Sequence, residues 1–137
     1  MAAISITAAN VLASSRAVTR TEYNFGTTIT QGQLCYLDTS NLWQTFDNDS
    51  ALGSGIATDR GIALNAGAAG QPARVVTSDP YFKVGGTLTK GLMVYGGNTA
   101  GAVTHDVPSA GQYTIGLGIA IDATYMNLQP VSAGVSV

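Results

Sequence analysis

Apolar and polar residues alternate along this chain in short runs, and each run is closed by a cluster of turn residues. Residues 29–46 show the pattern most clearly. Cys35 and Leu37 alternate with polar or amphipathic neighbours, the turn residues 39–41 follow, and residues 42–46 resume the apolar pattern. A period of two interrupted by Thr, Ser and Asn predicts a β-hairpin.

The same pattern returns at a constant offset in residues 88–105. Four residues are identical in the two stretches: Thr30, Gly32, Tyr36 and Thr45 fall on Thr89, Gly91, Tyr95 and Thr104. Further along, the sequence Gly-Ile-Ala at 61–63 returns at 118–120. We therefore interpret the chain as an internal repeat of one β-module, with halves of about 21–84 and 85–137 divided at Gly85-Gly86.

Gly, Pro and Asn residues separate further short apolar runs, which we expect to be strands at 21–25, 60–65, 71–78, 81–84, 113–121 and 125–131. A turn is expected at Asp79-Pro80. No stretch combines a sustained helical period with caps, although propensity alone allows a weak helix over 8–17. The pattern predicts an all-β domain, a barrel or a sandwich. A β-barrel-like domain is favoured because two halves that close on each other remove exposed sheet edges.

Residues 1–20 differ from the rest, since they contain no Gly and only brief apolar alternation. We predict an extended N-terminal arm here and a domain over 21–137. The arm is either a first strand of the domain or a segment that orders only on pairing with a partner. Its candidate anchors are apolar: Ile4, Ile6, Val11, Leu12 and Val18.

Charged residues make up only 10% of the chain, against roughly 25% in typical soluble domains. Ala, Gly, Thr and Ser stand where Lys and Glu are usual, which favours a surface partly covered by partners. The six Lys and Arg form no cluster and the net charge is −2, so we expect no nucleic-acid partner. No apolar run is long enough to span a membrane, and no membrane partner is expected.

Groups for catalysis are few. His105-Asp106 with Ser109 offers a base and its orienter, but adjacent strand residues point to opposite faces, which favours a polar loop. Residues 47–50 resemble the start of a calcium loop without its Gly and closing Glu. The 53–55 Gly-Ser-Gly lacks the flanks of a nucleophile elbow, and zinc ligands are too few. We expect no catalytic residue, no metal and no cofactor; the lone Cys35 is interpreted as a buried apolar residue.

We assign an architectural role to a set of glycines and strand residues in the two halves: Gly32, Tyr36, Trp43, Gly61, Gly91, Tyr95 and Gly118.

A family resemblance rests on these stretches. Residues 29–43 read I-T-x-G-Q-x-x-Y-L-D-x-S-N-x-W, residues 61–72 read GIALNAGAAGQP, and GLGIA at 116–120 precedes a strand that ends in Leu128-Gln129-Pro130. Over roughly residues 20–131 the chain resembles the capsid decoration, or cement, proteins of tailed bacteriophages.

The resemblance implies a small β-barrel-like domain of the β-tulip type that assembles as a homotrimer on the outside of the expanded head. Its partner would be the major capsid protein, reached by the arm, and the protein would be made in the bacterial host cytoplasm. The alternative is a tail or fibre β-module that binds a host-surface glycan. An exposed aromatic platform with carboxylates nearby would favour that alternative.

Overall fold

The computed structural model describes residues 2–49 and 59–136. Within them the regular structure consists of strands and one short 3-10 helix, η1 (Ala8–Asn10), so the all-β prediction is confirmed. The strands are β1 (Val18–Arg20), β2 (Asn24–Phe25), β3 (Leu34–Leu37), β4 (Leu42–Thr45), β5 (Arg60–Ala63), β6 (Val75–Lys83), β7 (Met93–Gly96), β8 (Val103–Thr104), β9 (Tyr113–Ile119), β10 (Tyr125–Leu128) and β11 (Val131–Ser136).

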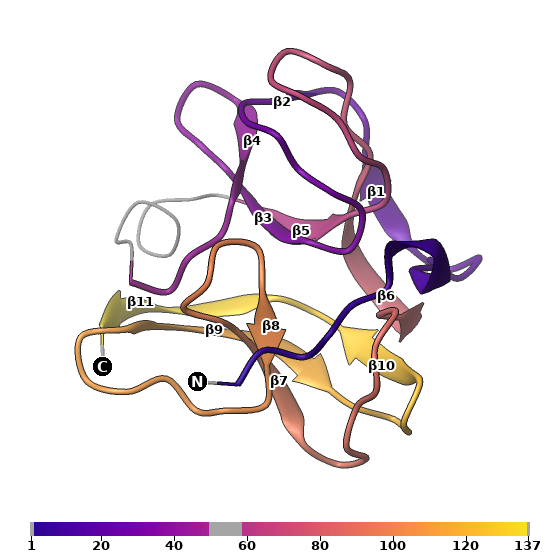
Figure 1. The fold of residues 1–137 in the computed structure, drawn as a ribbon, viewed down its shortest axis with the longest axis vertical. Helices are drawn as coiled ribbons and strands as arrows, with labels where there is room; N and C mark the ends of the chain where they lie inside the picture. The colour runs from indigo at the N-terminus through magenta and orange to yellow at the C-terminus, as the bar shows by residue number, and fades with distance from the viewer. Residues whose placement is uncertain (1, 50–58, 137) are drawn as a thin grey trace.

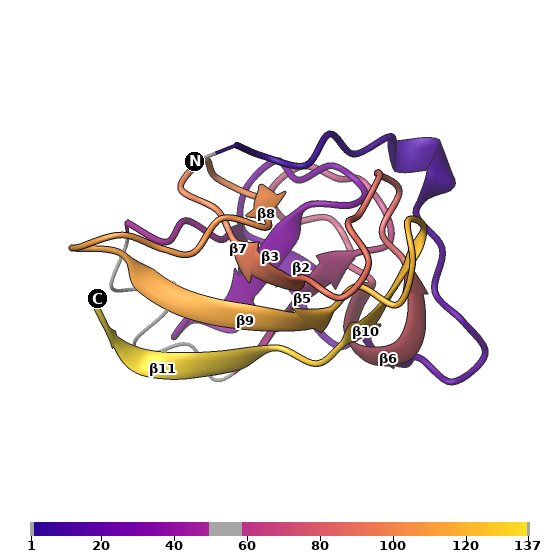
Figure 2. The ribbon, with the colours of Figure 1, turned by 90° about the horizontal axis from the view of Figure 1, so that it is seen from below.

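Two sheets form the molecule (Figure 1). The larger follows the order β1-β6-β5-β3-β4-β2 and is extended by β10, which pairs with β6. The smaller follows the order β11-β9-β7-β8, and Figure 2 shows β9 and β11 running side by side. The first sheet curls on itself and the second closes over its open end, which gives the barrel-like shape. Strand β10 belongs to the second half of the chain, so it ties the two halves together.

Equivalent strands in the two halves pair in the same register. Leu34 lies opposite Ile62 in the β3–β5 pair, and Met93 lies opposite Ile119 in the β7–β9 pair. Cys35 opposite Gly61 is likewise matched by Val94 opposite Gly118. The sequence comparison of the halves matches Leu34 with Met93 and Ile62 with Ile119, so each pair in the first half corresponds to a pair in the second. The internal similarity is therefore present in the strand pairing as well as in the sequence.

The turn predicted at Asp79-Pro80 is wrong, because β6 runs through both residues. The pairing of β6 with β10 shifts register between Met126 and Leu128, so β6 carries an extra residue at this point. A proline has no N–H to donate, and a β-bulge is one of the few places in a sheet where none is needed. Pro80 thus bends the strand at the point where its neighbour changes from β5 to β10.

The predicted hairpins form, but the end of the chain differs from expectation. Strands β3 and β4 pair antiparallel around a turn in which Asn41 adopts a φ of 61°. The single strand expected over 125–131 is instead two, β10 and β11, separated at Gln129-Pro130. Strand β11 extends to Ser136 and forms one edge of the small sheet, where no strand was predicted.

The core has two parts. One cluster lies between the two sheets and includes Leu34, Phe46, Phe82 and Leu117, all fully buried. The other fills the curl of the first sheet around Trp43 and includes Cys35, Val75 and Phe25. Trp43 therefore supports the first half alone, while Phe46 reaches the second half.

Candidate binding surfaces

The N-terminal arm lies against the body of its own domain, along the line where the two halves meet (Figure 1). The Ile4 N–H donates to the Val103 carbonyl at 2.8 Å, and the Thr7 N–H donates to the Gly85 carbonyl at 2.8 Å. Leu12 and Lys83 exchange two backbone hydrogen bonds, each of 3.0 Å. The arm thus touches β8 in the second half and β6 in the first.

Three glycines form the floor under the arm. A Cβ atom on Gly86 would lie 2.4 Å from the Ser5 carbonyl oxygen, and one on Gly85 would lie 2.8 Å from the Val11 side chain. A Cβ atom on Gly32 would lie 2.6 Å from Ile6. Side chains at these positions would lift the arm off the body. Gly85-Gly86, predicted as a divider between halves, is also the seat of the arm, a role that sequence reasoning missed.

Side chains hold both ends of the arm. At the start, the Ala2 N–H donates to Asp106 Oδ2 at 2.6 Å, and Thr104 Oγ1 donates to the Ala2 carbonyl at 2.6 Å. At the far end, the Ser14 N–H donates to Oδ2 of the buried Asp79 at 2.7 Å, and the Ser14 hydroxyl donates to Oδ1 of the same carboxylate. These contacts make the arm part of the folded domain.

The predicted anchors divide into two groups. Ile4 and Ile6 are half-buried against the main core cluster, and Val11 is buried within it. Leu12, at 63% exposure, and Val18 face solvent, and Val18 lies in β1, inside the segment predicted as arm. A partner can therefore reach Leu12 and Val18 without moving the arm.

The residues assigned an architectural role lie in strands, at close approaches of the backbone or in turns. Gly61 and Gly118 each face a backbone carbonyl of the neighbouring strand, at 2.3 Å and 1.7 Å from where a Cβ would stand. Gly91 has a φ of 84° with open space around it. Tyr36 and Tyr95 are half-buried on β3 and β7, and burial raises the pKa of Tyr36.

His105 and Asp106, the candidate catalytic residues, form hydrogen bonds with the backbone of the domain. His105 Nε2 accepts a hydrogen bond from the Thr89 N–H at 3.0 Å, which leaves the proton on Nδ1, 3.0 Å from the Met93 carbonyl. The imidazole thus braces the turn before β7, while Asp106 holds the arm. Burial raises the pKa of Cys35 to about 12, so its thiol is protonated at neutral pH.

The stretch that resembled a calcium loop is part of the scaffold. Asn48 is buried, and its backbone N–H donates to the Gly97 carbonyl at 3.0 Å. Across residues 2–49 and 59–136 no three His, Cys, Asp or Glu side chains gather as a metal site would require. Ser50 and residues 53–55 lie outside the described residues. In the part of the chain that the structure describes, no helix has the length and apolar character to cross a membrane.

An apolar face covers the outer side of the small sheet. Met93, Ile119 and Val131 surround a hollow of about 290 Å³, and Ile119 and Val131 are 51% and 65% exposed. Gly116 and Gly118 leave the middle of this face without side chains. Asn127 and Gln129 also line the hollow, and none of its described lining residues carries a charge. We call this the β7–β9–β11 face. Its sequence signal is the alternation of the two glycines with the buried Ile115 and Leu117.

An exposed aromatic pair lies on the other sheet. The rings of Tyr81 and Tyr125 stack with centroids 3.9 Å apart and planes inclined by 13°, and Tyr81 is 47% exposed. Partial desolvation, followed by the proximity of Tyr125 and Asp122, raises the pKa of Tyr81. Asp122 Oδ1 accepts the Thr124 and Tyr125 N–H groups, each at 2.8 Å, and so fixes the turn before β10.

A comparison with family models gave no match, and no curated protein matches the chain.

Proposed function

We propose that this protein is a structural, non-catalytic component of a tailed-phage virion. It binds the outer surface of the capsid through the major capsid protein, as a homotrimer, and stabilises the expanded head. The resemblance of residues 20–131 to capsid decoration proteins suggests this role, and the β7–β9–β11 face is the structural observation that carries it. Such a face is typical of a surface that another protein covers.

The physics of the face suits a permanent protein contact. The face presents the apolar side chains of Met93, Ile119 and Val131, and no charged residue of the described chain lines the hollow between them. Covering the face therefore removes no charge from water. Burying a side chain of this size contributes at most about 1.5–3 kcal/mol, and less where it is already partly covered. One such face gives a weak contact. A trimer multiplies weak contacts because the second and third engage at high effective concentration.

Only the end of the predicted arm, next to β1, is assigned to capsid binding. Strand β1 is an edge of the larger sheet, so its outer backbone groups are open to an added strand. Leu12 and Val18 lie on either side of the turn that precedes β1 and are exposed. We therefore assign a second capsid contact to this edge, in addition to the β7–β9–β11 face, and assign Ile4, Ile6 and Val11 to the stability of the domain.

The experiment is a binding titration of purified protein on undecorated heads of the phage that encodes it, with light scattering of the free protein to give its oligomeric mass. We expect saturable binding by the wild type and loss of binding by Ile119→Asp. The matched control is Val107→Asp, because Val107 is 71% exposed yet does not line the hollow. Absence of saturable binding by the wild type would refute the proposal.

A further inference from the structure

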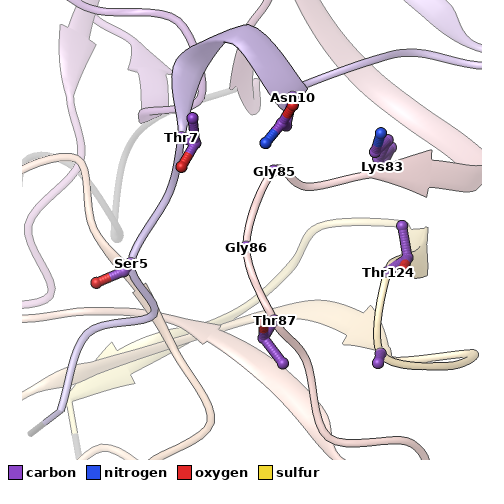
Figure 3. A pocket seen from close by; sticks show the side chains of 9 residues that line it. Ser5, Thr7, Asn10, Lys83, Gly85, Gly86, Thr87 and Thr124 are labelled. Carbon is purple, nitrogen blue, oxygen red and sulfur yellow. The ribbon is translucent and has the colours of Figure 1, made fainter.

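A polar pocket opens between the arm and the second half of the chain (Figure 3). Its volume is about 420 Å³, within the range of small-molecule sites. Its walls carry hydroxyl, amide and ammonium groups from three separate segments: Ser5, Thr7, Asn10, Lys83, Thr87 and Thr124. Gly85 and Gly86 form one side without side chains.

The stacked tyrosines continue this pocket along the same face of the sheet. Lys83 lines the pocket and lies directly opposite Tyr125 in the β6–β10 pair. Tyr81 is two residues from Lys83 on β6, and alternate residues of a strand share a face. Phe82, between Tyr81 and Lys83, and its partner Met126 are fully buried on the other face. The pocket, Lys83 and the two rings therefore form one continuous strip.

The chemistry of the strip excludes several ligand classes. An apolar ligand would leave the hydroxyls and amide of the pocket without hydrogen bonds. A polyphosphate or nucleic acid would need several cations, and Lys83 is the cation among the described residues that line the pocket. Asp122, close to Tyr81, further disfavours an anion at the aromatic end.

A sugar fits each part of the strip. Ser, Thr and Asn side chains both donate and accept hydrogen bonds, as sugar hydroxyls require. The C–H face of a pyranose carries partial positive charge and suits the negative face of an exposed tyrosine ring. We propose that this strip binds an oligosaccharide, with one pyranose in the pocket and the next against the Tyr81–Tyr125 pair.

This binding goes beyond the proposed function and does not depend on capsid attachment. Single-site affinity for such an open site is weak. Many copies displayed together would bind a glycan-coated surface through avidity.

The test uses the purified full chain on a printed array of neutral and uronic-acid-containing oligosaccharides, with no capsid present. We expect retention on at least one oligosaccharide, followed by a drop of about tenfold or more for Tyr81→Ala and for Thr87→Val. Tyr81→Phe keeps the ring and should keep the binding. Tyr113→Ala, at a half-buried tyrosine that does not line the pocket, should also bind normally.

Two results would overturn the inference: no oligosaccharide retained by the wild type, or equal retention by wild type and a folded Tyr81→Ala. Circular dichroism of each variant separates loss of binding from loss of fold. Since the capsid plays no part in the array, its outcome is independent of the titration on heads. Glycan binding without any binding to heads would instead favour the tail or fibre alternative.

Discussion

Gly32 and Gly91 donate the same hydrogen bond in the two halves of the molecule. The Gly32 N–H reaches the Ala63 carbonyl at 2.8 Å, and the Gly91 N–H reaches the Ala120 carbonyl at 2.9 Å. Both glycines have positive φ, 97° and 84°. Their surroundings differ, because Gly32 lies under the arm and Gly91 is open. Both halves thus need a glycine with positive φ at this position, but only the glycine of the first half also contacts the arm.

Alanine substitutions at the repeated glycines should differ in cost according to what a Cβ would meet. Gly91→Ala has space and should lose only about 1–2 kcal/mol from its left-handed backbone. Gly118→Ala would place a Cβ 1.7 Å from the Asn127 carbonyl oxygen at a φ of 134°, and should prevent folding. Urea denaturation and soluble yield measure both. A Gly118→Ala variant as stable as Gly91→Ala would contradict the geometry.

Two neighbouring arm residues should separate stability from binding. Val11→Ala removes a buried side chain and should destabilise the domain by about 1–3 kcal/mol. Leu12→Ala changes an exposed side chain and should alter stability by less than about 0.5 kcal/mol. If the β1 edge contacts the capsid, Leu12→Ala should instead weaken binding to heads. Denaturation midpoints and head titrations of both variants check this, and equal destabilisation by the two would show that the arm packs differently.

Gly86→Ala should loosen the arm, because the new methyl would meet the Ser5 carbonyl at 2.4 Å. Overpacking of this kind costs about 1–3 kcal/mol, so the population of the open arm should rise by about fivefold or more. Trypsin cleavage after the exposed Arg16, followed by mass spectrometry, reports that opening. Gly116→Ala is the control, since its nearest neighbour is Met93 Sδ at 3.8 Å. Unchanged cleavage of Gly86→Ala would mean that the arm is not seated on this glycine.

The buried thiol should make stability fall at high pH. Burial raises the pKa of Cys35 from 9.0 to about 12, so between these values the unfolded chain releases a proton that the folded chain keeps. Unfolding is therefore favoured as pH rises, by about 1.4 kcal/mol per pH unit. Below pH 9 both states hold the proton and the contribution is constant. Urea denaturation at pH 8, 9, 10 and 11 should show this extra slope in the wild type relative to Cys35→Ala; parallel curves would contradict it.

The sequence predicted the all-β class and the paired hairpins because these follow from local alternation and turn residues. It could not predict what Gly85 and Gly86 touch, since their neighbour is the arm, far away in sequence. The reading of Asp79-Pro80 as a turn followed local propensity, and the bulge against β10 overrode it. Tyr81 and Tyr125 likewise meet only because two distant strands pair. Local rules determined the elements, and long-range pairing determined the surfaces.

The bridge between Ala3 and Thr104 has a consequence for how the molecule is made. The arm leaves the ribosome before its seat at Gly85, Gly86 and Val103, which is synthesised much later. Through most of translation Ile4, Ile6 and Val11 have no groove to occupy. Contacts so distant in sequence close slowly, since the intervening chain must be ordered first. The residues of the arm are therefore expected to be among the last to reach their folded positions.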